Sequence, residues 1–296
     1  MSSDETENIP LGIFWMLCTM LLFVTMDAIA KLLGATYPVN LVVWGRFFFH
    51  MVLLAIFFRL SILTYLRSEK PALQVLRSTL MVITTALFFT GLSKSSLATA
   101  TTMMFLSPIY VTVLSIPLLG ESVGPRRWLG VFAGFAGAMI IIRPGSDSVS
   151  AANLYLLAAP LSNALYQLMT RKVREHDNEK TSLVYTALVG AIVTSVVAPF
   201  NWQTPDVSGW ALLALAGALG CVSHLCLIRA FRIAPASAVA PFSYTSLIWA
   251  TLYGYILFNN LPDRSTLLGA SIIISSGIYI FYRENRLKKT PEHIPN

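Results

Sequence analysis

Four ionisable side chains lie within long apolar stretches of the sequence and are the first candidates for chemistry. Asp27 and Lys31 belong to the first stretch, and Arg46 and His50 belong to the second. The members of each pair are four residues apart, so in a helix they share one face. A carboxylate, two cations and an imidazole could together bind opposite charges of one solute or exchange a proton.

Asp27 and Arg46 are expected at matching depth on neighbouring antiparallel helices. Asp27 precedes the short connection at 34–38 by about two helical turns, and Arg46 follows it by about as much. At about 1.5 Å per residue, both lie roughly 11 Å from the helix ends. Two interpretations stay open: a solute site, or a structural ion pair. Lys31 could instead extend toward the membrane interface, and His50 could be a hydrogen-bonded packing residue.

Aromatic residues form a second set of candidates within the apolar stretches. Pockets for organic solutes are mostly apolar and aromatic, with a few placed polar groups. For any single ring the alternative is packing against the core or against lipid. The aromatic candidates for solute binding are Trp44, Tyr110, Tyr166, Tyr244 and Trp249.

The composition indicates the kind of protein that must position these residues. Of 296 residues, 55% are hydrophobic and only 12% are charged, whereas soluble domains average about 25% charged residues. A soluble enzyme and a nucleic-acid-binding protein are therefore both disfavoured, despite the net charge of +7. The three cysteines show no ligand spacing, so no metal and no cofactor is expected. An integral membrane protein in contact with lipid fits best.

Ten apolar stretches can be distinguished, each near the 20 residues that span a bilayer. They cover approximately 10–33, 39–58, 72–92, 96–119, 126–143, 151–170, 181–200, 208–230, 236–258 and 265–283. Most of the 21 lysines and arginines, with Arg77 counted among the loop residues, fall on the side of the N-terminus. The positive-inside rule then places both termini in the cytoplasm. The fold class predicted is an all-α membrane protein with ten transmembrane helices in the inner (plasma) membrane.

An internal repeat is visible at a constant shift of 139 residues. Residues 95–100 align with residues 234–239, Tyr110 aligns with Trp249, and Gly130 aligns with Gly269. Each copy covers five helices, so the second enters the membrane from the opposite side. Inverted repeats of this kind are common in secondary transporters, with the solute site between the halves. Tyr110 and Trp249 could then face each other across a pseudo-symmetric cavity.

At this point the chain resembles the drug/metabolite transporter superfamily, in particular its EamA-type members. The resemblance rests on the small-residue pattern at 91–100, on Pro108, on residues 118–121, and on their second-half counterparts at 230–238 and 269–273. Residues 259–262 lack the acidic residue that Glu121 supplies in the first half. The residues around Asp27, Lys31 and Arg46 are similar to a subset that includes bacterial S-adenosylmethionine and riboflavin uptake proteins. The domains expected are a tail at 1–9, EamA-like repeats at 10–143 and 151–283, and a tail at 284–296.

The function predicted is secondary-active transport of a small organic metabolite by alternating access. The mixture of charges suggests a zwitterionic or amphoteric solute. An exporter of amino acids or drugs on the same scaffold is the alternative, and a membrane-embedded enzyme is a weaker one. No catalytic residue is assigned. Kinks at Pro108 and Pro241 could serve as hinges. The small residues around Gly130 and Gly269 fit either close helix packing or a homodimer contact.

Overall fold

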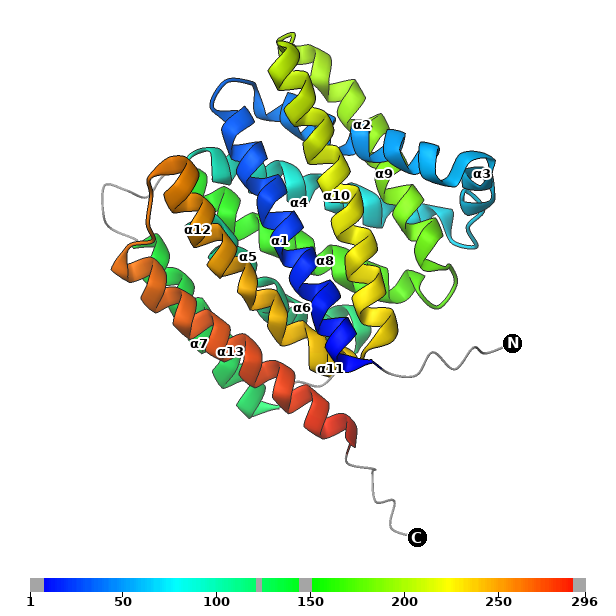
Figure 1. The fold of residues 1–296 in the computed structure, drawn as a ribbon. Coiled ribbons are helices and arrows are strands. Elements are labelled where there is room, and N and C mark those ends of the chain that lie inside the picture. The colour runs from blue at the N-terminus through cyan, green and yellow to red at the C-terminus, as the bar shows by residue number, and fades with distance from the viewer. Residues whose placement is uncertain (1–7, 121–123, 144–150, 290–296) are drawn as a thin grey trace.

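The computed structural model describes residues 8–120, 124–143 and 151–289, and these ranges are helical without a strand (Figure 1). The first half contains α1 (Ile9–Gly34), α2 (Val39–Phe58), η1 (Arg59–Ser61), α3 (Ile62–Tyr65), α4 (Pro71–Ser93), α5 (Leu97–Met104), α6 (Ser107–Leu119) and α7 (Pro125–Ile142). The second half contains α8 (Ala151–Val173), α9 (Glu179–Val197), η2 (Ala198–Asn201), α10 (Val207–Ile233), α11 (Ala236–Val239), η3 (Ala240–Thr245), α12 (Ser246–Phe258) and α13 (Arg264–Lys289). The all-helical class predicted from the sequence is confirmed for this part of the chain.

Seven helical segments in the described ranges are long and apolar enough to cross a membrane. They are α1, α2, α4, the stretch Leu97–Leu119 that contains α5 and α6, α9 with η2, α10, and the first part of α13. The apolar part of α7, Arg127–Ile142, is shorter. Helix α8 carries polar residues such as Asn163 and Gln167, and α12 is only 13 residues long. The three remaining predicted stretches therefore fall on helices that are less apolar or shorter than the other seven.

The outer surface of the bundle suits a lipid environment. Large apolar side chains point outward from most of the helices, and a surface this apolar would drive association in water. In a bilayer the same side chains face lipid tails of similar polarity. Examples are Phe14, Ile56, Phe57, Leu129, Phe132, Val196, Ile248 and Ile256.

Many hydroxyl groups inside the bundle are satisfied within their own helix. Several threonine hydroxyls donate to the carbonyl four residues earlier in the same helix, as Thr85 does to Met81 at 2.9 Å. This bond removes an unpaired hydroxyl from an apolar environment. Side-chain oxygens also accept hydrogen bonds from free N–H groups at helix starts. These caps are Asn8, Ser96, Asn178 and Asp206.

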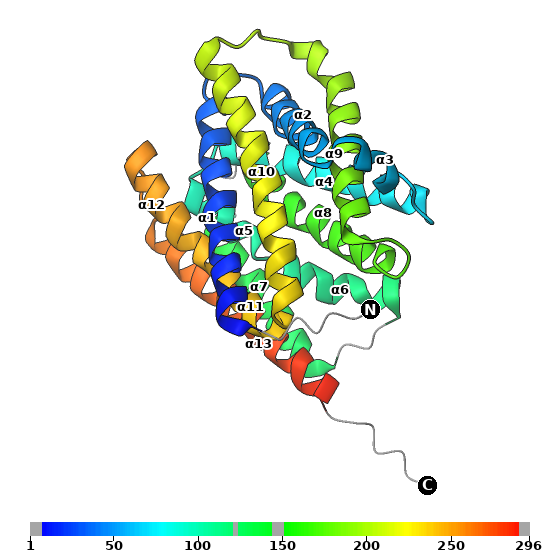
Figure 2. The same ribbon diagram turned by 45° about the vertical axis from the view of Figure 1, so that its right-hand side comes forward.

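The helices pack in pairs that join the two halves of the chain. Helix α1 lies along α10, α4 lies along α8, and α7 lies along α13, while α2 contacts both α9 and α10 (Figures 1 and 2). Glycines allow the α7–α13 approach: a Cβ on Gly137 would lie 2.9 Å from the carbonyl oxygen of Gly269. Ser276 of α13 also donates to the carbonyl of Gly130. These small residues therefore pack the two helices within one chain.

Two helices are broken beside the prolines that predicted kinks. Helix α5 ends at Met104, and α6 begins at Ser107 with Pro108 in its first turn, where the missing N–H costs nothing. In the second half, η3 contains Pro241 and separates α11 from α12. Helix α6 ends at Gly120, whose φ of 68° is left-handed. Glu121 lies outside the described residues.

Candidate functional site

Arg46 lies in the interior of the bundle on α2, with only 5% of its surface exposed. Its Nη1 donates a hydrogen bond to the hydroxyl of Thr85 on α4. The guanidinium also lies over two aromatic rings, with its Cζ 5.2 Å from the ring centre of Phe47 and 5.7 Å from that of Phe89. Its Nε has no hydrogen-bond partner. One donor of a buried cation is thus left open.

Asp27 on α1 is half-buried and close enough to Arg46 for an electrostatic interaction. A direct ion pair, one of the two interpretations left open by the sequence, is not formed, since no nitrogen of Arg46 lies within 4.0 Å of the Asp27 carboxylate in the described structure. Arg46 turns to Thr85 instead, because α4 packs against α2 at this level. The two opposite charges therefore share one region without neutralising each other by direct contact.

Two histidines extend this polar region. The rings of His50 on α2 and His224 on α10 are 5.8 Å apart. The Nδ1 of His224 lies 2.8 Å from the carbonyl of Gly220, and its ring packs edge-on against Phe23 of α1. The Nε2 of His50 is buried without a partner. The spacing of His50 from Arg46 indicated it in the sequence, whereas His224 carries no such signal, because its contact with His50 depends on how α2 and α10 pack.

Arg77 corrects one expectation taken from the sequence. Counted there among the loop residues, it is buried in α4 and only 2% exposed. It donates from Nη1 and Nη2 to the hydroxyl of Thr186 on α9, at 2.9 and 3.0 Å, and from Nη2 to the carbonyl of Ser182 at 2.8 Å. Its Cζ lies 4.9 Å from the ring centre of Tyr166. Basic residues of the preceding loop, Arg67 and Lys70, lie close to Arg77 in the sequence, and the sequence pattern therefore groups Arg77 with them.

Lys31 lies in the last turn of α1 and makes its contacts there, not with Arg46. Its Nζ donates to the carbonyl of Leu92, in the last turn of α4, at 3.0 Å and to the carbonyl of Ser95, just after α4, at 2.6 Å. It also lies 5.3 Å from the ring centre of Phe258. With residues 93–97 and α12 it lines a cavity of about 400 Å³ that Asp27 and Arg46 do not line.

The five aromatic candidates do not form one cluster. Trp44 donates to Ser195 at 3.0 Å and stacks on Phe48. Tyr110 packs edge-on against Phe135, and no ring contact joins it to Trp249 in the described structure. The indole nitrogen of Trp249 is buried without a partner. Of the five aromatic candidates, only Tyr166 reaches the buried arginines.

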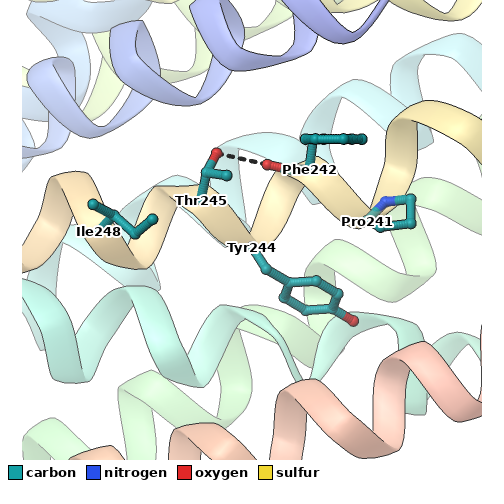
Figure 3. Close-up of a pocket in the computed structure, with 5 residues that line it drawn as sticks. All are labelled: Pro241, Phe242, Tyr244, Thr245 and Ile248. Atoms are coloured by element: carbon teal, nitrogen blue, oxygen red, sulfur yellow. Dashed lines mark hydrogen bonds between the residues drawn. The ribbon is translucent and has the colours of Figure 1, made fainter. Parts of the chain in front are cut away.

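Tyr244 lies at the break before α12. A cavity of about 280 Å³ is lined there by Pro241, Phe242, Tyr244, Thr245 and Ile248 (Figure 3). The Thr245 hydroxyl donates to the Phe242 carbonyl at 2.6 Å, and the Tyr244 ring points to the opposite side of the helix. That ring meets Phe105, at the break between α5 and α6, with 4.9 Å between ring centres.

Polar contacts link connections that are distant in sequence. Asp177, after α8, accepts hydrogen bonds from Ser68, Gln74 and the N–H of Glu69. Partial burial raises the pKa of the Asp177 carboxyl, but these hydrogen bonds outweigh it and hold that pKa below its ordinary value. Elsewhere Arg143, at the end of α7, forms an ion pair with Asp263, before α13.

The residues do not gather as ligands for a metal ion. In the described part of the chain, no group of three or more histidine, cysteine or acidic side chains could hold one. The interior instead combines one carboxylate, two guanidiniums and two imidazoles beside aromatic rings. Such an arrangement suits the binding of a polar organic molecule.

The long apolar helices, lipid-type exterior and buried charges are those of a multi-pass membrane protein. The chain belongs to the EamA-like transporter family, whose model matches residues 10–143 and again residues 150–282. It is therefore a membrane transporter of small metabolites and not an enzyme.

Characterised relatives match nearly the whole chain. An S-adenosylmethionine uptake transporter of Rickettsia bellii is 30% identical over 96% of this chain and 98% of its own length. An S-adenosylmethionine uptake transporter of Rickettsia prowazekii is 31% identical over 96% of this chain and 97% of its own length. A riboflavin transporter of Vibrio cholerae is 29% identical over 96% of this chain and 97% of its own length. A solved crystal structure superposes with a TM-score of 0.62, covering 94% of this chain and 99% of its own at 16% identity, and so shares the fold.

Proposed function

We propose that the protein is a secondary-active transporter that moves a small zwitterionic or amphoteric metabolite across the inner membrane by alternating access. The observation that carries this proposal is the polar region around Asp27 and Arg46, where opposite charges lie within the bundle without a direct ion pair. Charges inside a membrane protein are costly and usually mark a substrate path. Here each charge is free to contact a group of the opposite sign on a solute.

The site we propose consists of Asp27, Arg46, His50 and Tyr166, and it draws on α1, α2 and α8. Trp44, Tyr110, Tyr244 and Trp249 remain candidates for the walls of the path at other levels. Lys31 remains a candidate where a solute would enter the cavity of about 400 Å³. The names of the relatives favour two kinds of solute, S-adenosylmethionine and riboflavin. The first carries both signs of charge and matches this site better.

We further propose ten membrane-spanning segments arranged as two inverted repeats. Helix bounds support this, because a shift of 139 residues moves Ser107–Leu119 onto Ser246–Phe258 and Pro125 onto Arg264. Packing supports it too. The shift relates α1 to α8 and α10 to α4, so the α1–α10 pair corresponds to the α8–α4 pair, and both pairs pack extensively. An odd number of spans per repeat inverts the second copy.

Alternating access would then rock the two halves about the helices at their boundary. Five spans per half leave both termini on one side of the membrane. The excess of basic residues there argues for the cytoplasm. The hydrogen bonds of Asp177 and the Arg143–Asp263 ion pair would lie at opposite faces in this topology. Each could close the path on one side.

Uptake by purified protein in sealed lipid vesicles tests the proposed function. Labelled S-adenosylmethionine and riboflavin are the probes, with protein-free vesicles as the control. We expect saturable flux of at least one probe, which unlabelled solute on the opposite side accelerates. A receptor or scaffold would show binding without flux, and that result would refute the transport proposal.

A further inference from the structure

The interior of the bundle carries more positive than negative charge. Arg46 and Arg77 are 5% and 2% exposed, and neither has a carboxylate within 4.0 Å in the described ranges. Asp27 is the acid that interacts electrostatically with Arg46. Buried charges in proteins are normally paired, because an unpaired one has lost its hydration without compensation. One guanidinium is therefore left without a counter-charge.

Arg77 is held in place by neutral groups only. The Thr186 hydroxyl and the Ser182 carbonyl accept its Nη hydrogen bonds, and both belong to α9. These bonds fix the direction of the guanidinium but do not neutralise it. The Nε of Arg77 has no partner, and neither has that of Arg46. Both cations keep a donor available for an anionic acceptor.

Tyr166 lies near both arginines. The Cζ of Arg77 lies 4.9 Å from its ring centre, and its phenol lies close enough to Arg46 for an electrostatic interaction. The ring is half-buried and comes from α8, in the other half of the chain. Arg77 precedes Thr85, the partner of Arg46, by eight residues on α4, which is about 12 Å along the helix. The two cations thus lie at successive depths along α4, with the Tyr166 side chain close to both.

We propose that Arg46 and Arg77 are successive binding subsites for one anionic group of the transported solute, with the Tyr166 ring as the partition between them. The solute class this implies is a metabolite that carries a carboxylate together with a cationic group, the latter facing Asp27. An anion arriving at Arg77 supplies the counter-charge that the structure lacks. The inference rests on the proposed transport function and adds Arg77, which the resemblance did not assign.

Paired transport measurements test the inference. S-adenosylmethionine and its decarboxylated analogue are compared as probes in vesicles, so that the carboxylate is the only group that differs. We expect Arg77→Gln to raise the KM for S-adenosylmethionine about ten-fold or more, the loss typical of one charge-assisted contact. The KM for the decarboxylated probe should change less than about two-fold. Thr186→Val is the matched control, since it removes two hydrogen bonds of Arg77 but leaves the arginine charge in place. We expect this variant still to transport S-adenosylmethionine in preference to the decarboxylated analogue.

The possible outcomes distinguish the role of Arg77 from the proposed transport function. Equal effects of Arg77→Gln on both probes would show that Arg77 only fixes α4 to α9, and would overturn the inference. If that variant does not fold, Arg77→Lys replaces it. Loss of the guanidinium fork should then weaken the carboxylate preference several-fold, and an unchanged preference would overturn the inference. Riboflavin flux without S-adenosylmethionine flux would also overturn it, yet would leave the transport function standing. Flux of no probe at all would overturn both.

Discussion

Arg46 donates its hydrogen bond to the hydroxyl of Thr85 and not to the carboxylate of Asp27. The acid stays half-buried and makes no hydrogen bond within the described chain. A structural ion pair would bring the two side chains into direct contact. Their separation instead leaves a negative and a positive group available on two different helices. This relationship is the physical basis of the solute site that we propose.

Neutralising Asp27 should affect transport more than stability. We expect Asp27→Asn to reduce the uptake of S-adenosylmethionine about ten-fold or more, because one charge-assisted contact with the solute is lost. Thermal unfolding in detergent should change little, since no ion pair is broken. Glu175→Gln, at an exposed acid, is the matched control and should leave uptake unchanged. A large loss of stability with the KM unaltered would indicate a structural role for Asp27.

Lys31 should show the opposite pattern. Its Nζ donates to the carbonyls of Leu92 and Ser95 near the end of α4. The Leu92 carbonyl also accepts from the Ser95 N–H, so Lys31→Met leaves the Ser95 carbonyl without a partner. We expect a loss of about 1–3 kcal/mol in unfolding free energy, with the KM changed less than about two-fold. Lys94→Met is the control, because Lys94 lines the same cavity and is exposed. A selective increase in KM would instead assign Lys31 to the solute path.

The contact of Asp177 with the α3–α4 connection should make stability depend on pH. Hydrogen bonds hold the pKa of Asp177 below its ordinary value, despite partial burial. The unfolded chain therefore binds a proton more readily, and the stabilisation is present above about pH 4 and lost as the pH falls further. We expect Asp177→Asn to flatten this part of the stability profile, measured by thermal unfolding from pH 3 to 6. Glu175→Gln should keep the profile of the unmodified protein, and an identical profile for Asp177→Asn would contradict the assignment.

The rings of Phe105 and Tyr244 join the two broken helices, 4.9 Å apart in an edge-to-face contact. A shift of 139 residues relates their positions, so the contact lies where the proposed symmetry axis would pass. If both breaks move together, Phe105→Ala and Tyr244→Ala should each lower the maximal rate, and the double variant should be no slower than either.

A double-mutant cycle on unfolding measures the same contact. We expect a coupling free energy of about 0.5–1.5 kcal/mol, typical of aromatic pairs. Phe132→Ala, on the exposed face of α7, is the control for loss of an aromatic ring. Additive effects of Phe105→Ala and Tyr244→Ala on both rate and stability would show that the two breaks act independently.

The sequence predicted the all-helical class and the breaks beside Pro108 and Pro241, because hydrophobic length and proline chemistry act locally along the chain. The ten spans stay a prediction, since seven helical segments in the described ranges are long and apolar enough to cross a membrane. The sequence also indicated Asp27, Arg46 and His50, since charged groups are conspicuous in apolar stretches. It did not place Arg77, because nearby loop residues of the same charge masked it. Nor did it indicate that Trp44 points away from Arg46. Apart from a few polar residues such as Arg46 and His50, helix α2 carries apolar residues on all its faces, so its pattern does not say which face meets which neighbour.

The central claim is that buried charges of both signs bind the solute during transport. Exchange of labelled for unlabelled S-adenosylmethionine across vesicle membranes tests it most directly, comparing the unmodified protein with Arg46→Gln and with Arg67→Gln at an exposed position. We predict that Arg67→Gln exchanges like the unmodified protein and that Arg46→Gln, folded and inserted equally well, loses at least about nine-tenths of the exchange. Unmodified exchange and unmodified KM in Arg46→Gln would contradict the account.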